Sequence, residues 1–192
     1  TAEMYPVPPK AETQGLTEQY IGNWLAKSGK REKVVLATKV AGPRSVPYIR
    51  ENMSLNRRHI HTAIDDSLKR LQTDYVDLYQ LHWPQRPTNC FGQLNYPYPD
   101  KQEEVTLIET LEALTELVKA GKVRYIGVSN ETPWGVMKYM KLSEENNLPR
   151  MMSIQNVYSL VNRVFDIHNS EVSIRENCGL LAYSPLAGGR LS

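Results

Sequence analysis

The sequence predicts an α/β fold with a parallel sheet, most simply a (β/α)8 TIM barrel, and three observations support this fold class. Short runs rich in β-branched residues alternate with segments of helical period along the 192 residues, as in successive βα units. Five successive strand ends, from Lys39 to Tyr183, lie about 36 residues apart on average, near the roughly 31 residues per unit of a barrel. A doubly wound sheet would have similar spacing, but no GxGxxG turn follows any strand, so a Rossmann fold lacks its main support.

The first part of the chain predicts a strand end, a helix and a complete short strand. Residues 1–5 could be the exit of a strand whose body lies upstream, and the proline-rich loop after them excludes regular structure. Residues 17–27 have helical period, and the run VVLATKV at 34–40 predicts a buried strand with Lys39 near its end. The expected apolar face of the helix comprises Tyr20, Ile21, Trp24 and Leu25.

The next unit places a histidine at the end of a strand. A helix is predicted from Asn56 to Leu71, with Ser54 or Asn56 as its cap. Residues 74–82 then favour an extended, largely buried segment, and Pro84 prevents the strand from continuing past His82 and Trp83. A long loop from Gln85 to about Lys101 leaves the same edge, and its Phe91, Tyr96 and Tyr98 are expected to line the substrate pocket.

Three further units complete the chain. A helix is predicted over 103–120, terminated by Gly121, and a second one begins at Pro133 after the cap Thr132. The runs VRYIGVSN, MMSIQN and GLLAYSPL predict the three remaining strands, and a less regular helix is expected between residues 165 and 177. The alternation of helix and strand is therefore maintained to the end of the sequence.

Composition excludes several classes of partner. The 23 basic and 21 acidic residues give a formal net charge of +2, so nothing predicts binding to nucleic acid or to an anionic membrane. No apolar run approaches the roughly 20 residues that span a bilayer, and no signal peptide opens the sequence. Cys90 and Cys178 lie far apart without metal-ligand spacing and are expected to be free thiols. These features predict a cytoplasmic protein without a metal site.

Polar side chains stand at the carboxyl ends of the predicted strands. A barrel brings these ends to one face, which is the active face. Taken singly, a strand-end lysine or histidine, a turn serine or asparagine, and a glutamine or tyrosine each have an ordinary structural explanation. Their joint placement on one edge favours a site instead. Trp83 is expected to line its pocket, whereas Trp24 and Trp134 are expected in the core. The residues at the five ends are Lys39, His82, Ser129 with Asn130, Gln155, and Tyr183 with Ser184.

These strand ends resemble those of a known family. The strings TAEMY, ATK, LYQLHWP, GVSN, IQN and AYSPL are similar, in this order, to the strand ends of the aldo-keto reductases, (β/α)8 enzymes that use a nicotinamide cofactor. The longer strings at 67–92 and 121–132 resemble the bacterial Tas-type branch of that family. The resemblance extends over residues 1–192 and implies a single aldo-keto reductase domain that lacks the first strands and the last strand. It also implies that the family's catalytic aspartate would stand immediately before Thr1.

The resemblance implies a reaction and roles for the polar residues. An NADPH-dependent enzyme would reduce an aldehyde or ketone, with Tyr5 as general acid, Lys39 as its charge partner and His82 orienting the carbonyl. Such a reaction develops negative charge on oxygen, which a nearby donor must stabilise and protonate, and a close ammonium would lower the pKa of a tyrosine. Ser129, Asn130 and Gln155 would hold the nicotinamide carboxamide, Tyr183 would stack on its ring, and Ser184 and Leu186 would begin the pyrophosphate loop.

Two other functions are compatible with the same pattern. A nicotinamide-binding module without catalysis, as in the potassium-channel β subunits, would share the fold and the strand ends, and turnover with simple aldehydes would distinguish it. A barrel lyase or isomerase without cofactor has less support, because no carboxylate pair, metal-ligand cluster or phosphate loop stands at the strand ends.

Overall fold

The computed structural model describes residues 1–43, 46–96 and 105–192. Within these residues the centre of the fold is a five-stranded sheet of order β1-β2-β3-β4-β5, in which all neighbouring strands are parallel. Its strands are β1 (Ala37–Val40), β2 (Val76–Leu81), β3 (Val123–Ser129), β4 (Met151–Gln155) and β5 (Gly179–Leu180). A sequential parallel order is that of consecutive units of a (β/α)8 barrel, as predicted.

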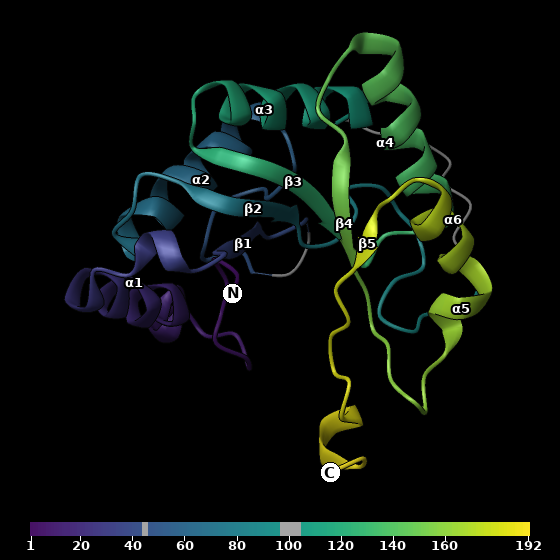
Figure 1. The fold of residues 1–192 in the computed structure, drawn as a ribbon, viewed down its shortest axis with the longest axis horizontal. Helices are drawn as coiled ribbons and strands as arrows, with labels where there is room; N and C mark the ends of the chain where they lie inside the picture. Colours follow the sequence, from purple (N-terminus) through teal and green to yellow (C-terminus); the bar gives the residue numbers. More distant parts are fainter. Residues whose placement is uncertain (44–45, 97–104) are drawn as a thin grey trace.

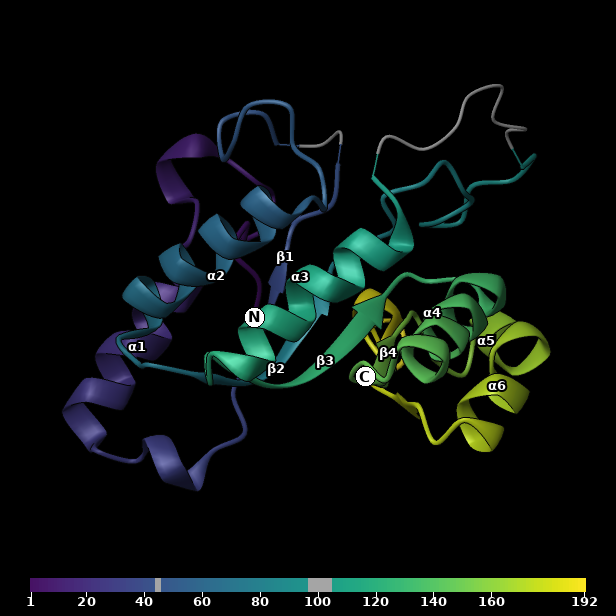
Figure 2. The ribbon, with the colours of Figure 1, turned by 90° about the horizontal axis from the view of Figure 1, so that it is seen from above.

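The helices form a layer on the outer side of this sheet. In Figure 1 the strands form an arch, with α2, α3 and α4 along its outer side and both chain ends on its open side. Figure 2 shows α3 lying across the outer face of the sheet beside α2, and the neighbouring helices of this series contact one another. The helices are α1 (Leu16–Ser28), α2 (Arg57–Leu71), α3 (Leu107–Lys119), α4 (Pro133–Asn146), α5 (Val164–His168) and α6 (Ser170–Arg175).

The main core fills the space between the sheet and this helical layer. It contains buried apolar residues of α2 and α3, which recur with helical period on the face of each helix that is turned to the strands. Asn56 caps α2 by accepting a hydrogen bond from the His59 N–H at 2.8 Å, and Thr132 caps α4 through the Gly135 N–H at 3.2 Å. The predicted helix starts are therefore confirmed at both of these positions.

The segment before β1 continues the sheet without forming a regular strand. The backbone nitrogens of Thr1 and Glu3 donate to the carbonyls of Ala37 and Lys39 at 3.0 and 3.2 Å. This alternation is that of parallel pairing. Thr1 to Glu3 therefore follow the edge of β1, and Tyr5 comes just beyond the paired section.

Several predicted bounds change. The strand predicted over 34–40 begins only at Ala37, and the last predicted strand is reduced to two residues plus a bridge between Val157 and Tyr183. The predicted start of α3 at residue 103 lies outside the described residues. Its first helical residue is Leu107, because Thr106 accepts from the Glu109 N–H and caps the helix.

The expectation that Trp24 and Trp134 belong to the core is wrong. Trp24 is 47% exposed and Trp134 is 59% exposed. On α1, the Cα of Gly22 faces the Arg70 carbonyl so closely that a Cβ would lie 2.2 Å from the oxygen. This contact turns Gly22 inward and leaves Trp24 towards solvent. Trp134 instead lies on the surface against the Arg86 guanidinium, 4.9 Å from its ring centroid.

Among the helices of the described residues, none combines the length and apolar character needed to cross a membrane.

Candidate active site

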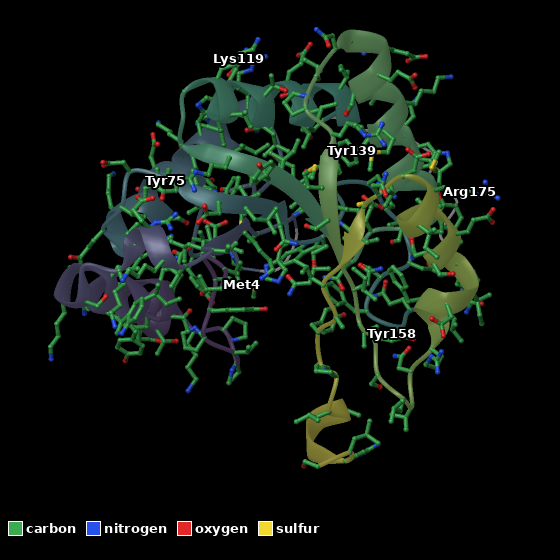
Figure 3. The ribbon with its side chains drawn as sticks, viewed as in Figure 1. Met4, Tyr75, Lys119, Tyr139, Tyr158 and Arg175 are labelled. Atoms are coloured by element: carbon green, nitrogen blue, oxygen red, sulfur yellow. The ribbon has the colours of Figure 1, made fainter. Side chains whose placement is uncertain are left out.

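Tyr5 lies in a turn at the carboxyl edge of the sheet, beyond the residues that pair with β1. Its N–H donates to the Ala2 carbonyl at 3.1 Å, and its own carbonyl accepts from the Gly15 N–H at 3.0 Å. The phenol is half-buried. Figure 3 shows the neighbouring Met4 on the open side of the arch of strands. The turn therefore carries Tyr5 just beyond the carboxyl end of the segment that pairs with β1.

Lys39 and His82 face Tyr5 from the next two strands. The Lys39 Nζ atom lies 5.4 Å from the centroid of the Tyr5 ring and donates to the Thr1 carbonyl at 2.7 Å. The His82 ring meets the Tyr5 ring edge to face, with centroids 5.6 Å apart. Both side chains are buried. The structure thus brings together the three residues predicted to be catalytic.

Burial sets the protonation of this group. It lowers the pKa of Lys39 to about 8, opposed by the negative charge of Glu18. Burial and the charge of Lys39 lower the pKa of His82 to about 3. Burial raises the pKa of Tyr5. At neutral pH the site therefore holds a charged lysine, a neutral imidazole and a neutral phenol.

The raised pKa of Tyr5 differs from the lowering that a close ammonium was expected to cause. Burial penalises the phenolate more than Lys39 favours it at this separation. The phenol therefore keeps its proton at neutral pH.

Trp83 forms one wall beside these residues. Its ring centroid lies 4.9 Å from that of His82 and 6.1 Å from that of Phe91. The indole N–H donates to the Pro43 carbonyl at 3.0 Å, and a Cβ at Gly42 would fall 2.4 Å from the indole nitrogen. A glycine at 42 is therefore needed to hold the indole in place.

Asn130 is the centre of a hydrogen-bond network across three further strand ends. Its Nδ2 atom donates to the His82 carbonyl at 2.9 Å, and its Oδ1 atom accepts from the Tyr183 hydroxyl at 2.8 Å. The Ser129 hydroxyl donates to the Gln155 carbonyl at 2.7 Å. Asn130 has a φ of 52°, a conformation that asparagine adopts more easily than most residues. The network connects His82 with the residues predicted to bind the cofactor.

Unpartnered buried atoms at this edge fit a polar ligand. Among the described residues, the buried Nδ1 of His82, Oε1 of Gln155 and Oδ1 of Asn156 have no hydrogen-bond partner. Buried polar atoms are nearly always paired, and an unpaired glutamine oxygen can accept from a carboxamide N–H. The residues present therefore fit a nicotinamide amide at Gln155, with the half-buried Tyr183 ring adjoining the network.

The structure does not bring the last two predicted cofactor residues to this network. Ser184 and Leu186 follow β5 on the segment that extends away from the sheet in Figure 1, and Leu186 is 54% exposed. In the long loop after β2, Phe91 contacts Trp83 while remaining exposed, as is Tyr96. Tyr98 lies outside the described residues.

Sequence reasoning missed two buried ion pairs behind the edge. Glu3 binds both terminal nitrogens of Arg50, at 2.6 and 2.7 Å. Arg86 binds both carboxylate oxygens of Glu131 and also donates to the Thr132 hydroxyl at 2.9 Å. All four side chains are at most 10% exposed. One signal was available, because Glu3 and Glu131 are charged residues inside the strings TAEMY and GVSNET.

The described residues contain neither a candidate metal-ligand cluster nor a disulfide bond. In residues 1–43, 46–96 and 105–192, no three His, Cys, Asp or Glu side chains gather where they could hold a metal ion. Cys90 and Cys178 are both free thiols.

Comparison with known proteins identifies the family of the chain. The family model described as "Aldo/keto reductase family" matches residues 1–192. The protein tas of Escherichia coli is 58% identical over the whole chain, which covers 56% of that relative. An aldo-keto reductase of Babesia bovis is 40% identical over 83% of the chain and 60% of its own length. An oxidoreductase of Bacillus subtilis, YrpG, is 38% identical over 92% of the chain and 50% of its own length.

The chain thus spans between half and 60% of the length of these curated relatives. The match of the whole chain to the family model, together with the 58% identity to a Tas protein, confirms the resemblance inferred from the strand ends. The chain belongs to the aldo/keto reductase family.

Proposed function

We propose that the protein is an NADPH-dependent oxidoreductase that reduces an aldehyde or ketone to an alcohol, with Tyr5 as the general acid. The observation that carries the proposal is the meeting of Tyr5, Lys39 and His82 on one edge, with Lys39 5.4 Å and His82 5.6 Å from the Tyr5 ring. Family membership supports the reaction class.

Each residue of this group has a protonation state suited to its proposed role. The neutral Tyr5 phenol donates its proton to the carbonyl oxygen, on which negative charge develops. The charged Lys39 stabilises the phenolate that remains, which matters more because the site is buried. The neutral His82 offers a ring N–H that orients the carbonyl and does not compete as an acid.

The cofactor would be held by the next strand ends. Gln155 would accept from the nicotinamide carboxamide, Ser129 and Asn130 would fix the adjoining backbone, and Tyr183 would lie against the ring. Ser184 and Leu186 would contact the pyrophosphate, and Trp83 would line the substrate pocket. When bound, the nicotinamide supplies the hydride. The protein's own contribution is to fix the carbonyl between Tyr5 and the ring.

Replacement of Tyr5 tests the proposal. Tyr5→Phe removes the hydroxyl proposed to donate the proton and keeps the ring. We expect carbonyl reduction to fall by about 1,000-fold or more, with NADPH affinity unchanged. Steady-state NADPH oxidation with a panel of simple aldehydes measures the first quantity, and fluorescence quenching by NADPH measures the second.

The same experiment distinguishes the catalytic protein from a sensor. Tight NADPH binding by the wild-type protein without turnover of any aldehyde would favour a nicotinamide-binding module instead. Full turnover by Tyr5→Phe would refute the assignment of Tyr5 as acid.

A further inference from the structure

We propose that the buried ion pair between Glu3 and Arg50 positions Tyr5 against Lys39. Glu3 and Arg50 are therefore positioning residues of the reaction. The inference rests on the proposed reductase function. It concerns a carboxylate that does not reach the reacting atoms and that acts through the backbone segments carrying the two catalytic residues.

Glu3 is fixed through its backbone on both sides. Its N–H donates to the carbonyl of Lys39 at 3.2 Å, and its carbonyl accepts from the Gln14 side chain at 2.7 Å. Glu3 is only 1% exposed and lies two residues before Tyr5. The residue is therefore the last firmly held point before the turn that presents the phenol.

The carboxylate of Glu3 connects three segments. Its Oε1 atom accepts from the Ala41 N–H at 2.6 Å and from the Arg50 Nη2 atom at 2.7 Å, while its Oε2 atom accepts from the Arg50 Nη1 atom at 2.6 Å. Ala41 lies two residues after Lys39. A single carboxylate thus fixes the chain two residues before Tyr5 and two residues after Lys39, and Arg50 holds it from the following loop.

This connection matters because Tyr5 has little support of its own. Its segment lies outside every regular strand. Its backbone donates one turn bond to Ala2 and accepts one bond from Gly15. The small apolar cluster against which Tyr5 packs draws Ala41, Val46 and Met53 from the segment that contains Arg50. Its buried members are Ala2, Met4, Ala41, Val46, Met53 and Trp83. If the loop that contains Arg50 became mobile, the apolar residues that pack against Tyr5 would therefore become mobile as well.

A two-oxygen contact between a guanidinium and a carboxylate fixes orientation as well as distance. A displacement of about 1 Å at a reacting group can lower a rate about 100-fold. We call the two-oxygen contact between Arg50 and Glu3 the fork. Its loss should therefore slow proton transfer from Tyr5, while the residues on β3 and β4 proposed to bind the cofactor remain in place.

The test uses Glu3→Gln in the full-length protein. Glutamine can still accept from the Ala41 N–H but cannot form the charged fork with Arg50. We expect kcat per NADPH-binding site to fall about 10- to 100-fold, the NADPH Kd to change less than twofold, and the solvent deuterium isotope effect on kcat to rise. A purely structural role would lower the number of binding sites without changing that isotope effect.

Arg50→Lys keeps the buried charge and replaces the fork with a single contact. We expect a smaller loss of kcat per site, about fivefold, with a rise in the isotope effect as well. This variant tests the inference even if Glu3→Gln does not fold.

Asp77→Asn is the matched control, because Asp77 is also a buried carboxylate bound to arginines but lies at the other end of the sheet. We expect it to keep the wild-type kcat per site. The inference would be overturned if Glu3→Gln and Arg50→Lys both kept the wild-type kcat per site and the wild-type isotope effect. Absence of turnover in the wild-type protein would overturn the proposed function instead.

Discussion

The two ends of the sheet both collect charged and aromatic side chains, but they differ in how far these groups satisfy one another. At the amino end, Asp77 accepts from Arg31, from Arg124 and from the Leu36 N–H, each at 2.8 Å. The two guanidinium groups lie 3.9 and 4.2 Å from the centroid of the Tyr75 ring. Figure 3 shows Tyr75 at the start of β2, away from Met4.

The carboxyl end is left incomplete by comparison. In the described part of the chain, Asp77 and Arg31 have no buried unpartnered side-chain atom, whereas His82, Gln155 and Asn156 each have one. Lys39 remains charged there even though burial opposes its charge. The comparison indicates that polar residues at the amino end stabilise the fold, while those at the carboxyl end leave buried polar atoms that a ligand could pair.

Replacement of Lys39 should lower activity strongly without lowering stability. Because the pKa of Lys39 is lowered to about 8, its proton is bound less tightly in the folded protein than in the unfolded chain, where the pKa is about 10.4. The charge therefore destabilises the fold fully below pH 8. This destabilisation is removed as the pH rises from 8 towards 10.4.

We expect Lys39→Met to lower kcat about 1,000-fold and to leave the free energy of unfolding at pH 7 unchanged or higher. Urea unfolding and steady-state kinetics measure the two quantities. A strong loss of stability would make Lys39 a structural residue and would contradict the difference inferred between the two ends of the sheet.

The next largest effect is expected at Asp77, with the opposite separation. Asp77→Asn leaves two arginines beside a neutral amide, so we expect a loss of about 3 kcal/mol in the free energy of unfolding with kcat unchanged where the protein is folded. Thermal unfolding gives the first and turnover per binding site the second.

The pH dependence of this loss has a defined sign. Burial alone would raise the pKa of Asp77, but the Leu36 N–H and the Arg31 guanidinium lower it. Its contribution to stability is therefore complete above the unfolded value of about 3.9 and is lost as the pH falls through the lower folded value. The difference between wild type and Asp77→Asn should shrink in that range, and a difference that grew would contradict the assignment.

The smallest expected effect concerns the hydroxyl of Tyr183. Tyr183→Phe keeps the ring but removes the 2.8 Å bond to Asn130, which is worth about 1 kcal/mol. We expect the NADPH Kd to rise about fivefold and kcat to change little, as measured by fluorescence titration. Tyr125→Phe, at an exposed tyrosine of β3, is the matched control, and an equal effect in both variants would remove the role given to Asn130.

The fold was predictable where the signal is local. The helical period of α2 and α3 and the caps Asn56 and Thr132 depend on neighbours within a few residues, and the structure confirms them. The exposure of Trp24 was not predictable in this way. It depends on the contact between Gly22 and Arg70, two residues 48 positions apart whose meeting no period encodes.

The order of the βα units and the identity of the residues at the strand ends could be read from the sequence alone. The physical reason is that parallel strands bring their carboxyl ends to one edge, so that Tyr5, Lys39 and His82 meet once the units follow one another. The two-oxygen contact between Glu3 and Arg50, the pairing of Arg86 with Glu131 and the protonation states of Lys39 and His82 became visible only in the folded protein. These depend on burial and on distances between segments far apart in the chain, which have no local signature.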